Sequence, residues 1–341
     1  ASGGTLITIT GAYLALTTGV TVGGVPCSNV TAVNATTVTA VTPAGTLGNA
    51  DVVITGGKGT ITVPGGFRYV SIVVPAWATL VEAQPDPGVV TDAALRSAIT
   101  ATGLAWRVRD TATQVEMLLI PPGTFQMGCT NQNGCISLAQ PEHSVTLTKA
   151  FYLGRYELTQ AQWTAKMGRN PSYFKWEPDS ASRPVEQVSW NTIQGYLSAT
   201  GFRLPTEAEW EFAARGGVST AFPWGDAPDS VAAMQTAWYT SNSGGTTHDV
   251  GQLKANGNGL KDMMGNVMEW VNDWKGSYAN VTVKNFLGSR EPGLIPERVI
   301  KGGSFSYDFR YLRFSGRSAN YPTLSSAATE YVGFRCVLGA I

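Results

Sequence analysis

The sequence predicts two domains of different class, an all-β sandwich over residues 1–70 and a larger domain of mixed helices and strands over residues 115–341. Three observations lead to this prediction. The chain has 341 residues, more than one typical domain contains. Residues 1–70 are rich in Thr, Val and Gly and contain none of the 10 Trp. From Val115 onward the sequence is aromatic, Gly-rich and irregular, and residues 71–114 are a predicted connector.

Six short segments within residues 1–70 alternate between apolar and polar side chains with period two, as β-strands do. Gly, Pro or Asn residues between them mark the turns. Short strands at this spacing are typical of an all-β sandwich. The six segments are Thr5–Thr10, Val20–Val22, Val30–Val33, Thr37–Val41, Asp51–Thr55 and Gly59–Val63.

The connector contains one turn-rich break and one predicted helix. Ala83–Gly88 includes two Pro and one Gly, which favour a turn. Asp92 and the preceding Thr are placed to cap a short helix that runs through Thr100 and ends near Gly103.

The clearest helix of the larger domain is predicted over Thr206–Arg215. Thr206 is followed three residues later by Glu209, the spacing of a capping box, and an apolar stripe at helical spacing comes after it. Two further helices are predicted over Thr159–Met167 and Trp190–Thr200.

Three charged residues of the helix predicted over Thr206–Arg215 lie on one face. Glu207, Glu211 and Arg215 follow one another at intervals of four residues, which favours contacts between them along the helix surface. A pair of carboxylates can also serve in acid–base catalysis, so an acid–base site at Glu207 and Glu211 is the alternative interpretation.

Charge and composition argue against several classes of function. The chain carries 24 basic and 24 acidic residues without a basic run, so no nucleic-acid partner is expected. No apolar stretch approaches the roughly 20 residues that cross a bilayer, so no membrane insertion is expected. The chain contains only two His, His143 and His248, and a three-histidine metal centre is excluded by that count.

The four cysteines give no metal-binding or redox motif. Cys129 and Cys135 lie in a turn-forming stretch and either close a small disulfide loop or remain two free thiols. Cys27 and Cys336 fall in predicted strands, where we expect them to be small buried residues.

Several long strings in the larger domain are specific enough to indicate a family. In their order along the chain they closely resemble the formylglycine-generating-enzyme (sulfatase-modifying-factor) family, from Val115 to the C-terminus. The resemblance implies an α+β domain with a C-type lectin-like core, often bound to calcium. The strings are Met117–Gly128, Tyr156–Thr159, Pro184–Trp190, Arg203–Gly217, Asn258–Trp270, Lys301–Ser304 and Gly333–Cys336.

Three shorter pieces of residues 1–70 resemble the IPT/TIG family of Ig-like modules. They are Gly23–Pro26, Val41–Gly45 and Pro64–Val70. The resemblance implies an N-terminal Ig-like sandwich that acts as a spacer or attachment module, with no chemistry of its own.

A calcium site is predicted at Asp262, Gly265, Val267 and Glu269. Two carboxylates with backbone carbonyls between them along a tight turn offer the hard oxygen ligands that calcium prefers. The resemblance implies ligation by the side chains of Asp262 and Glu269 and by the carbonyls of Gly265 and Val267. A capped turn with a solvated Asp is the alternative.

The catalytic residues of the enzyme family are missing. Members that make formylglycine use two cysteines shortly after the Gly-Gly-Ser as copper ligands, but here no cysteine lies between Cys135 and Cys336. Monovalent copper needs soft ligands such as thiolates, so we expect no copper and no oxidase activity. Ser304 has no recognisable triad partner, so nucleophilic catalysis is not expected either.

The C-terminal segment 305–332 has the composition of a binding surface. It contains four Tyr with many Ser, Ala and Thr, and no Lys, Trp, Met or Gln. Tyr among small polar residues provides rigid contact area together with adaptable hydrogen bonding. We predict ligand contacts at Ser306, Tyr307, Asp308, Tyr311, Ser318, Asn320 and Tyr321. The alternative is that these are ordinary surface and core positions.

The layout of this segment resembles the variable proteins of diversity-generating retroelements. In those proteins adenine-directed mutagenesis changes selected codons near the C-terminus, and codons varied in this way cannot encode Lys, Glu, Gln, Met or Trp. The segment fits this pattern apart from Glu330, which would be a fixed position.

The sequence therefore predicts a non-catalytic recognition protein at the cell exterior or on a virion surface. Its expected partner is a protein or glycan ligand on a cell surface, with calcium as a structural cofactor. One alternative is a structural virion or decoration protein that uses the same domain for self-assembly contacts. A formylglycine-generating oxidase is the third and least favoured interpretation.

Overall fold

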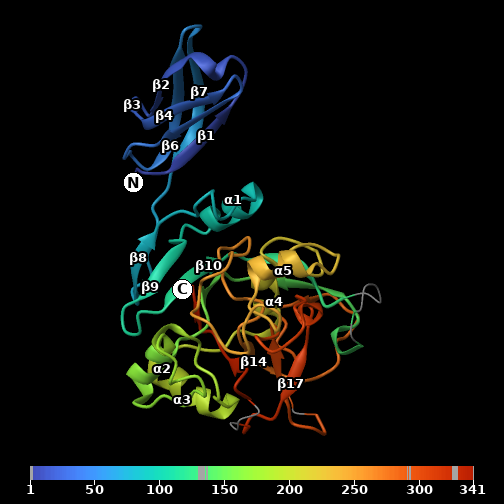
Figure 1. Ribbon diagram of the computed structural model, residues 1–341. Coiled ribbons are helices and arrows are strands. Elements are labelled where there is room, and N and C mark those ends of the chain that lie inside the picture. Colours follow the sequence, from blue (N-terminus) through green and yellow to red (C-terminus); the bar gives the residue numbers. More distant parts are fainter. Residues whose placement is uncertain are drawn as a thin grey trace. The chain divides into compact units, whose positions relative to one another are not determined.

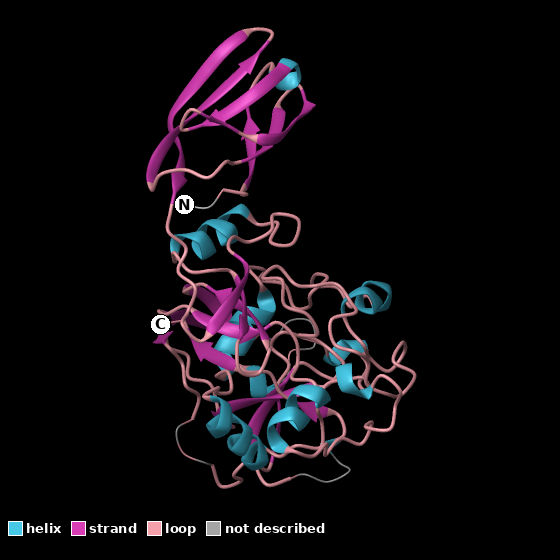
Figure 2. Ribbon diagram, turned by 90° about the vertical axis from the view of Figure 1, so that its left-hand side faces the viewer, coloured by secondary structure: helices cyan, strands magenta, loops and turns pink. Residues whose placement is uncertain are grey.

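The computed structural model describes residues 3–129, 135, 137–289, 291, 293–324 and 329–340 (Figure 1). The chain divides into two compact units, residues 1–73 and residues 74–341. Strands make up the first unit almost entirely, whereas the second combines short strands and helices with long loops (Figure 2). Among the described residues, no helix has both the length and the apolar character needed to cross a membrane.

The first unit is a sandwich of two antiparallel sheets. One sheet has the order β1 (Leu6–Thr10), β5 (Thr37–Val41), β4 (Ser28–Asn34). The other has the order β3 (Val25–Pro26), β2 (Thr17–Val22), β6 (Gly48–Gly56), β7 (Gly59–Tyr69), and a short 3-10 helix, Leu14–Leu16, precedes β2. The predicted alternating segments are confirmed as strands, several of them longer than predicted.

Alternation along these strands builds the core of the first unit. On β2 the side chains of Val20 and Val22 are buried while their neighbours are not, because successive side chains of a strand point to opposite faces. Cys27 packs partly buried against this core instead of being fully buried as predicted. The buried core residues are Leu14, Val20, Val22, Val38, Ala40, Val52, Ile54 and Tyr69.

The segment predicted as a connector belongs largely to the second unit. Its strands β8 (Ala78–Glu82) and β9 (Arg107–Asp110) extend a sheet that continues through β10 (Glu116–Ile120), β13 (Phe151–Gly154) and β19 (Val337–Gly339). These two strands carry polar and charged residues at many positions, such as Arg107, which pairs with Glu82 and Glu116. A short strand with so many polar residues gives little hydrophobic periodicity.

Two further small sheets complete the second unit. The order of one is β11 (Gly123–Met127), β12 (His143–Leu147), β15 (Val283–Lys284). The other has the order β17 (Ser318–Asn320), β16 (Arg298–Lys301), β14 (Met268–Trp274), β18 (Val332–Gly333).

Five α-helices and three 3-10 helices are described around these sheets. The α-helices are α1 (Ala93–Ala101), α2 (Gln160–Met167), α3 (Trp190–Thr200), α4 (Glu207–Arg215) and α5 (Ser230–Thr236). The 3-10 helices are Ser137–Ala139, Ser180–Ser182 and Phe309–Tyr311. All four helices predicted from the sequence are confirmed to within two residues at either end.

Helix α4 begins as its sequence predicts and packs onto the sheets beside it. The Thr206 hydroxyl accepts from the Glu209 amide, and the Glu209 carboxylate accepts from the Thr206 amide, so both halves of the capping box form. On its buried face Trp210 donates its indole N–H to Glu269 of β14 at 2.7 Å. Helix α4 also contacts β11 and β16.

Candidate functional site

The loop that follows β16 leaves the sheet through two glycines. Gly302 and Gly303 have φ values of 98° and 69°, which favour glycine over other residues. A Cβ at Gly303 would lie 2.5 Å from the Leu312 side chain, so the loop closes tightly on itself at this point. Side chains remain buried through Phe305, and exposure begins at Ser306.

A 3-10 turn at Phe309–Tyr311 forms the outer part of this loop. The Asp308 carboxylate accepts from the Arg310 amide at 3.0 Å and from the Arg310 Nε at 2.7 Å. The contact with the Arg310 side chain holds the pKa of Asp308 below its usual value. The turn leaves the Tyr311 side chain 62% exposed.

A cavity of about 550 Å³ opens along the loop, and we call it the tyrosine cavity. The rings of Tyr307 and Tyr311 meet edge to face with their centroids 5.8 Å apart, and Tyr331 lies 6.0 Å from Tyr307 in the same manner. The cavity is lined by Pro228, Met268, Gly302, Gly303, Tyr307, Arg310, Tyr311, Arg313, Ser315, Gly316, Arg317 and Ser318.

Three of the seven predicted ligand-contacting residues line this cavity, namely Tyr307, Tyr311 and Ser318. The other four lie outside it. Ser306 is exposed, and its hydroxyl lies 3.1 Å from that of Ser304. Asp308 is held by Arg310, the Asn320 side chain accepts from the Tyr321 amide at 2.9 Å, and Tyr321 is an exposed residue after β17.

Two backbone hydrogen bonds hold Tyr307 in place. Its amide donates to the Ser304 carbonyl at 3.1 Å, and its carbonyl accepts from the Thr240 amide at 3.0 Å. Burial, followed by the neighbouring Tyr331 and Tyr311, raises the pKa of Tyr307. The phenol therefore stays neutral at physiological pH and can both donate and accept a hydrogen bond.

Sequence reasoning missed the arginines of the tyrosine cavity. Arg310, Arg313 and Arg317 all line it, and Asp308 is the only acidic residue between positions 305 and 324. The Arg313 guanidinium lies over the ring of Phe222, 4.4 Å from its centroid. The excess of Arg over acidic residues in this segment could have indicated a positively charged lining, but the prediction was based on the Tyr content.

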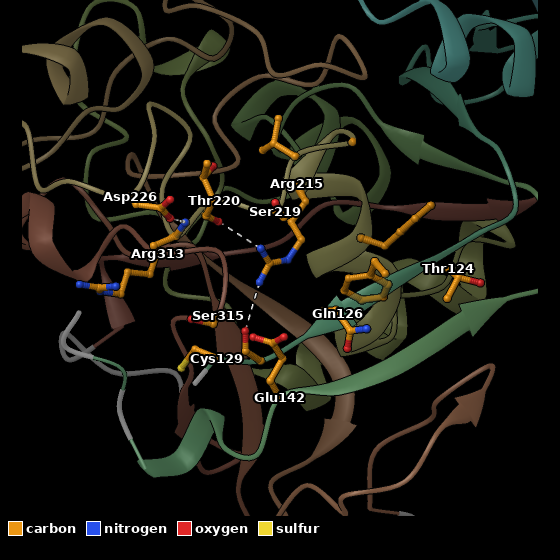
Figure 3. A pocket seen from close by; sticks show the side chains of 16 residues that line it. Thr124, Gln126, Cys129, Glu142, Arg215, Ser219, Thr220, Asp226, Arg313 and Ser315 are labelled. Carbon is orange, nitrogen blue, oxygen red and sulfur yellow. Dashed lines mark hydrogen bonds between the residues drawn. The ribbon is translucent and has the colours of Figure 1, made fainter. Parts of the chain in front are cut away.

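A second cavity of about 430 Å³ is lined by residues of β11, of α4 and of the loop that follows β16, among others (Figure 3). We call it the framework cavity. In Figure 3 the Arg215 guanidinium lies between Asp226 and Arg313 on one side and Gln126 on the other. Arg215 donates to the carbonyls of Gly128 and Thr220 at 3.2 and 3.1 Å. The cavity is lined by Thr124, Phe125, Gln126, Gly128, Cys129, Glu142, Phe212, Arg215, Gly217, Val218, Ser219, Thr220, Ala221, Asp226, Arg313 and Ser315.

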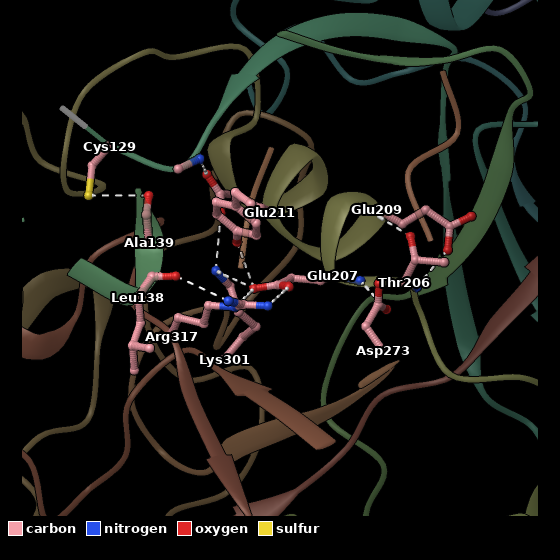
Figure 4. Close-up of polar contacts among 12 residues, drawn as sticks. Cys129, Leu138, Ala139, Thr206, Glu207, Glu209, Glu211, Asp273, Lys301 and Arg317 are labelled. Carbon is pink, nitrogen blue, oxygen red and sulfur yellow. Dashed lines mark hydrogen bonds and ion pairs between the residues drawn. The ribbon is translucent and has the colours of Figure 1, made fainter. Parts of the chain in front are cut away.

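Two buried cations tie the ends of the loop to helix α4 (Figure 4). At the start of the loop, Lys301 Nζ donates to Glu211 Oε2 at 3.0 Å. At its end, the Nε and Nη2 of Arg317 donate to the two oxygens of Glu207 at 2.7 and 3.0 Å. These four side chains, which we call the loop clamp, are 0–3% exposed.

The loop clamp assigns a structural role to the two carboxylates of α4. Burial alone would raise the pKa of Glu211, but Lys301 and Arg215 outweigh it and hold that pKa below its usual value. Glu207 accepts from Arg317 and also from the Tyr278 hydroxyl at 2.8 Å. Both carboxylates are already paired with buried cations inside the protein, so the alternative of an acid–base pair on this helix is not supported.

A third buried carboxyl lies at the N-terminus of α4. Asp273 Oδ2 accepts from the Glu207 amide at 2.7 Å, whereas Asp273 Oδ1 has no hydrogen-bond partner. Burial, followed by the charge of Glu207, raises the pKa of Asp273 to about 8. The folded protein therefore holds a proton here that the unfolded chain releases near pH 4.

We expect Asp273→Asn to flatten the pH dependence of stability. Because the folded pKa is raised, the stability linked to Asp273 is fully present below pH 4 and is lost as the pH rises towards 8. Asn keeps the acceptor for the Glu207 amide but does not ionise. Urea denaturation from pH 4 to 9 should show the wild type losing ~2–5 kcal/mol more than the variant. Parallel curves would contradict a raised pKa at this residue.

The residues predicted to bind calcium form a different arrangement. Arg335 donates to both oxygens of Glu269 at distances of 2.6 to 2.9 Å and to the Asp262 carbonyl at 3.1 Å. The Asp262 carboxylate instead accepts from the Gly251 amide at 2.6 Å. The predicted ligand set therefore does not fit a cation, because a guanidinium already occupies the Glu269 carboxylate. In the described part of the chain, no three or more Asp, Glu, His or Cys side chains are arranged so that they could hold a metal ion.

Calcium chelation tests whether Arg335 or a calcium ion neutralises Glu269. Glu157 lies in the same cluster and accepts from the Val267 amide at 3.0 Å, and burial followed by Asp262 and Glu269 raises its pKa. Arg335 supplies the positive charge that these carboxylates need, so we expect excess chelator to leave the Tm of the second unit unchanged. A lower Tm that added calcium restores would reinstate the calcium site.

The four cysteines form one disulfide and leave two free thiols. Cys129 and Cys135 form a disulfide, which decides between the two predicted alternatives. Cys336 is buried as predicted, and burial raises the pKa of its thiol. Among the described residues that line the tyrosine cavity, the thioether of Met268 is the only sulfur donor.

Comparison with known sequences identifies relatives of both units. The sequence model of the sulfatase-modifying factor enzyme 1-like domain matches residues 90–340, and that of the IPT/TIG domain matches residues 1–69. The formylglycine-generating enzyme of Thermomonospora curvata is 38% identical over 192 residues, which cover 52% of this chain and 61% of that protein. The match thus spans less than two thirds of that relative's length.

Solved structures of similar fold include a variable protein. Treponema denticola variable protein 1 aligns with a TM-score of 0.59 at 28% identity and covers 66% of this chain and 95% of its own. PvdO from Pseudomonas aeruginosa aligns with a TM-score of 0.55 at 24% identity, covering 68% of this chain and 97% of its own, which shows a shared fold. The predicted order of an Ig-like sandwich and a C-type lectin-like domain is confirmed.

Proposed function

From residue 90 to residue 340 the chain belongs to the sulfatase-modifying factor enzyme 1-like family, and we propose that it is a non-catalytic, ligand-binding member of it. The binding surface is the tyrosine cavity together with the exposed residues of the loop that follows β16. The IPT/TIG domain serves as a spacer or attachment module. The protein acts at the cell exterior or on a virion surface, where it binds a protein or glycan ligand of a cell.

The observation that carries the proposal is the pairing of Tyr307 and Tyr311 in the lining of a cavity, on a firmly anchored loop. Tyr rings bury a large area on contact with a ligand while losing little conformational entropy. The loop clamp fixes both ends of the loop independently of the outward-facing residues between them. Such a loop can change its outer residues without losing its anchor, which suits a surface selected for binding.

The lining of the tyrosine cavity also argues against oxidase chemistry. Cu(I) sites need soft ligands, and the described lining offers a single thioether and no thiol. Stoichiometric and tight Cu(I) binding in a titration would contradict the non-catalytic assignment.

The likeness to Treponema denticola variable protein 1 supports a diversified surface. Sequencing the 3′ end of this gene across a natural population should reveal substitutions concentrated at Ser306–Tyr311 and Ser318–Ala328, of which 325–328 lie outside the described residues. Gly302–Ser304 should remain fixed because it forms the tight turn after β16. Gly333–Arg335 should remain fixed because the Arg335 guanidinium holds Glu269. Variation spread evenly along the gene would contradict diversification and leave a fixed binding surface.

Replacement of the cavity tyrosines tests the binding surface itself. In screens against arrays of glycans and cell-surface proteins, Tyr307→Ala and Tyr311→Ala should each weaken the binding of any captured ligand about 30-fold, as expected for a residue at the centre of an interface. Tyr173→Ala is the matched control, because Tyr173 is 56% exposed and lies outside the cavity. Equal affinity of all three variants and the wild type would contradict the proposal.

One observation favours a structural role as the second candidate. Leu294 and Ile295 are exposed large apolar residues next to one another in the chain, as expected of a subunit contact. A decoration or virion protein would bury the tyrosine cavity against a neighbouring subunit. Protection of Tyr311 from solvent in an assembled particle would favour this candidate over ligand binding.

A further inference from the structure

The edge strand of the larger sheet in the first unit has an uncovered inner face. Strand β7 pairs with β6, and Ile61 of β7 lies opposite Ile54. Two residues further on, Val63 lies opposite Val52. The side chains of directly opposite residues share one face of a sheet, so Ile61 and Val63 face the same side as the core. The two β6 side chains are 7% and 5% exposed, whereas Ile61 is 59% and Val63 is 43% exposed.

The smaller sheet of the sandwich does not cover these two residues. It has three strands, β1, β5 and β4, and it faces a sheet of four strands that ends in β7. The side chains of Val38 and Ala40 on its middle strand, β5, are completely buried. Ile61 and Val63 therefore form an apolar surface at the edge of the core that stays open to solvent.

The outer edge of β7 offers backbone groups for pairing. Among the described residues, β6 is the only strand that pairs with β7. The hairpin turn between these strands contains two residues and closes on the pair Gly56↔Gly59. In a hairpin of this type alternate residues point their N–H and C=O groups away from the partner strand, and on β7 these are Thr60 and Thr62. Pro64 follows in the same alternation, which is the position where an edge strand tolerates Pro.

The other sheet edges of this unit are less suited to pairing with a second chain. Strand β3 is two residues long and contains Pro26, and β4 has two irregularities in its register. Strand β1 has no such feature, but its inward-facing Ile7 and Ile9 pack against the core. Over Gly59–Val63, β7 has no charge, no Pro and no bulge, and it also leaves apolar side chains open. An edge of this kind is a template for another strand.

We propose that β7 is a self-association site at which the first units of two chains pair edge to edge. The inference goes beyond the proposed function and does not rest on it. The two β7 strands run antiparallel about a two-fold axis at Thr62, so that Ile61 lies opposite Val63 of the partner subunit. Two such apolar pairs continue the inner face of the sheet across the axis. The backbone groups of Thr62 exchange two hydrogen bonds with Thr62 of the partner subunit.

A second copy fits this edge because the pairing segment is self-complementary. Ile61 and Val63 stand at equal distances from Thr62 along the strand, so a single two-fold rotation places an apolar side chain opposite each of them. The hairpin turn limits the segment at one end, and Pro64, which lacks an N–H, limits it at the other. A segment this short forms a small interface, so we expect weak dimerisation with a Kd of about 100 µM.

Sedimentation equilibrium of the full chain measures the association. Between about 10 and about 500 µM the chain should pass from mostly monomer to mostly dimer. Hydrogen exchange at both ends of this range locates the contact, because the amides of Thr60 and Thr62 point to solvent in the monomer and Thr62 is paired in the dimer. Exchange of the Thr62 amide should slow about threefold at the higher concentration, while that of Thr31 on β4 stays constant.

Charges at Thr62 test the register. Thr62 is exposed and would lie opposite its own copy, so Thr62→Lys brings two ammonium groups together across the axis. Thr62→Lys and Thr62→Asp should each weaken dimerisation about fivefold and keep the wild-type Tm. An equimolar mixture of the two variants should associate at least as tightly as the wild type, because each Lys then faces an Asp. Thr31→Lys, on an exposed Thr of β4, is the matched control and should leave association unchanged.

The outcomes decide between a second copy and other occupants of this edge. Association that both single variants weaken and their mixture restores confirms the self-association site. A chain that stays monomeric at the highest concentration overturns it, and so does a dimer that Thr62→Lys and Thr62→Asp leave unchanged, because that dimer forms through another surface. An extended peptide that protects the Thr62 amide of a monomeric chain would make a foreign strand the occupant and overturn the second copy.

Discussion

Replacing Glu207 with Gln is expected to lower the free energy of unfolding of the second unit by ~3–5 kcal/mol. The substitution removes the negative charge that faces the buried guanidinium of Arg317 and leaves that cation with neutral partners. Removing one partner of a buried ion pair costs much more than the pair itself contributes, because the remaining charge stays desolvated. Urea denaturation followed by Trp fluorescence measures the change, since all 10 Trp lie outside residues 1–70.

Glu209→Gln is the matched control on the same helix. Glu209 also pairs with an arginine, but that partner, Arg203, is 44% exposed. A surface pair contributes little, so the control should lose only ~1 kcal/mol. Equal losses in the two variants would show that Arg317 does not depend on Glu207.

The loss of stability in Glu207→Gln should extend to the loop that follows β16. Arg317 fixes the end of the loop, so hydrogen exchange of the amides from Ser306 to Gly316 should accelerate in Glu207→Gln under conditions where the unit remains folded. In Glu209→Gln the same amides should exchange at the wild-type rate. Acceleration in both variants would indicate a general loss of stability instead of a release of the loop.

Replacing Arg335 with Met is expected to produce the second large loss, ~3–5 kcal/mol. Arg335 is completely buried and holds Glu269 together with the carbonyls of Gly154 and Asp262. Met fills much of the same volume without the charge, so the variant isolates the electrostatic loss from that of an empty cavity. Equilibrium denaturation at neutral pH provides the measurement.

Arg203→Met is the control for this second prediction. It removes an arginine that pairs with both oxygens of Glu209, but at the surface, and we expect a loss of ~1 kcal/mol or less. A loss in Arg335→Met no larger than in this control would show that the buried cluster tolerates an unpaired carboxylate. In that case a bound cation becomes the better explanation of how Glu157, Asp262 and Glu269 coexist.

Two groups of buried charged residues hold the scaffold around the loop that follows β16. One is the loop clamp, and the other, which we call the Arg335 cluster, consists of Arg335 with Glu269 and the carbonyls of Gly154 and Asp262. The Arg335 cluster joins β13, β14 and the loop at Asp262, and the loop clamp joins α4 to both ends of the loop that follows β16. The outward-facing Tyr307, Arg310 and Tyr311 contribute to neither cluster. Substitutions at these three residues should therefore change binding far more than stability.

Local sequence signals were sufficient for most strands of the sandwich and for four of the helices, but not for β8 and β9 in the predicted connector. Alternation predicted the strands of the sandwich, and the Thr206 to Glu209 spacing predicted the start of α4, because hydrogen bonds and burial within one segment decide these features. The order of the long strings indicated the family and the C-type lectin-like fold, which the comparisons confirm. The missing cysteines were likewise visible without a structure.

Only the tertiary structure decided which charged groups from distant segments meet. Glu207 and Arg317 are 110 residues apart, and Arg335 reaches Glu269 across 66 residues, so no local pattern reveals either pair. The calcium ligands were predicted from the spacing of oxygen ligands and from the family resemblance, and neither could show that Arg335 contacts Glu269 from 66 residues away. The two cavities are also built from segments far apart in the chain, so the sequence could indicate the tyrosines but not which distant residues line a cavity with them.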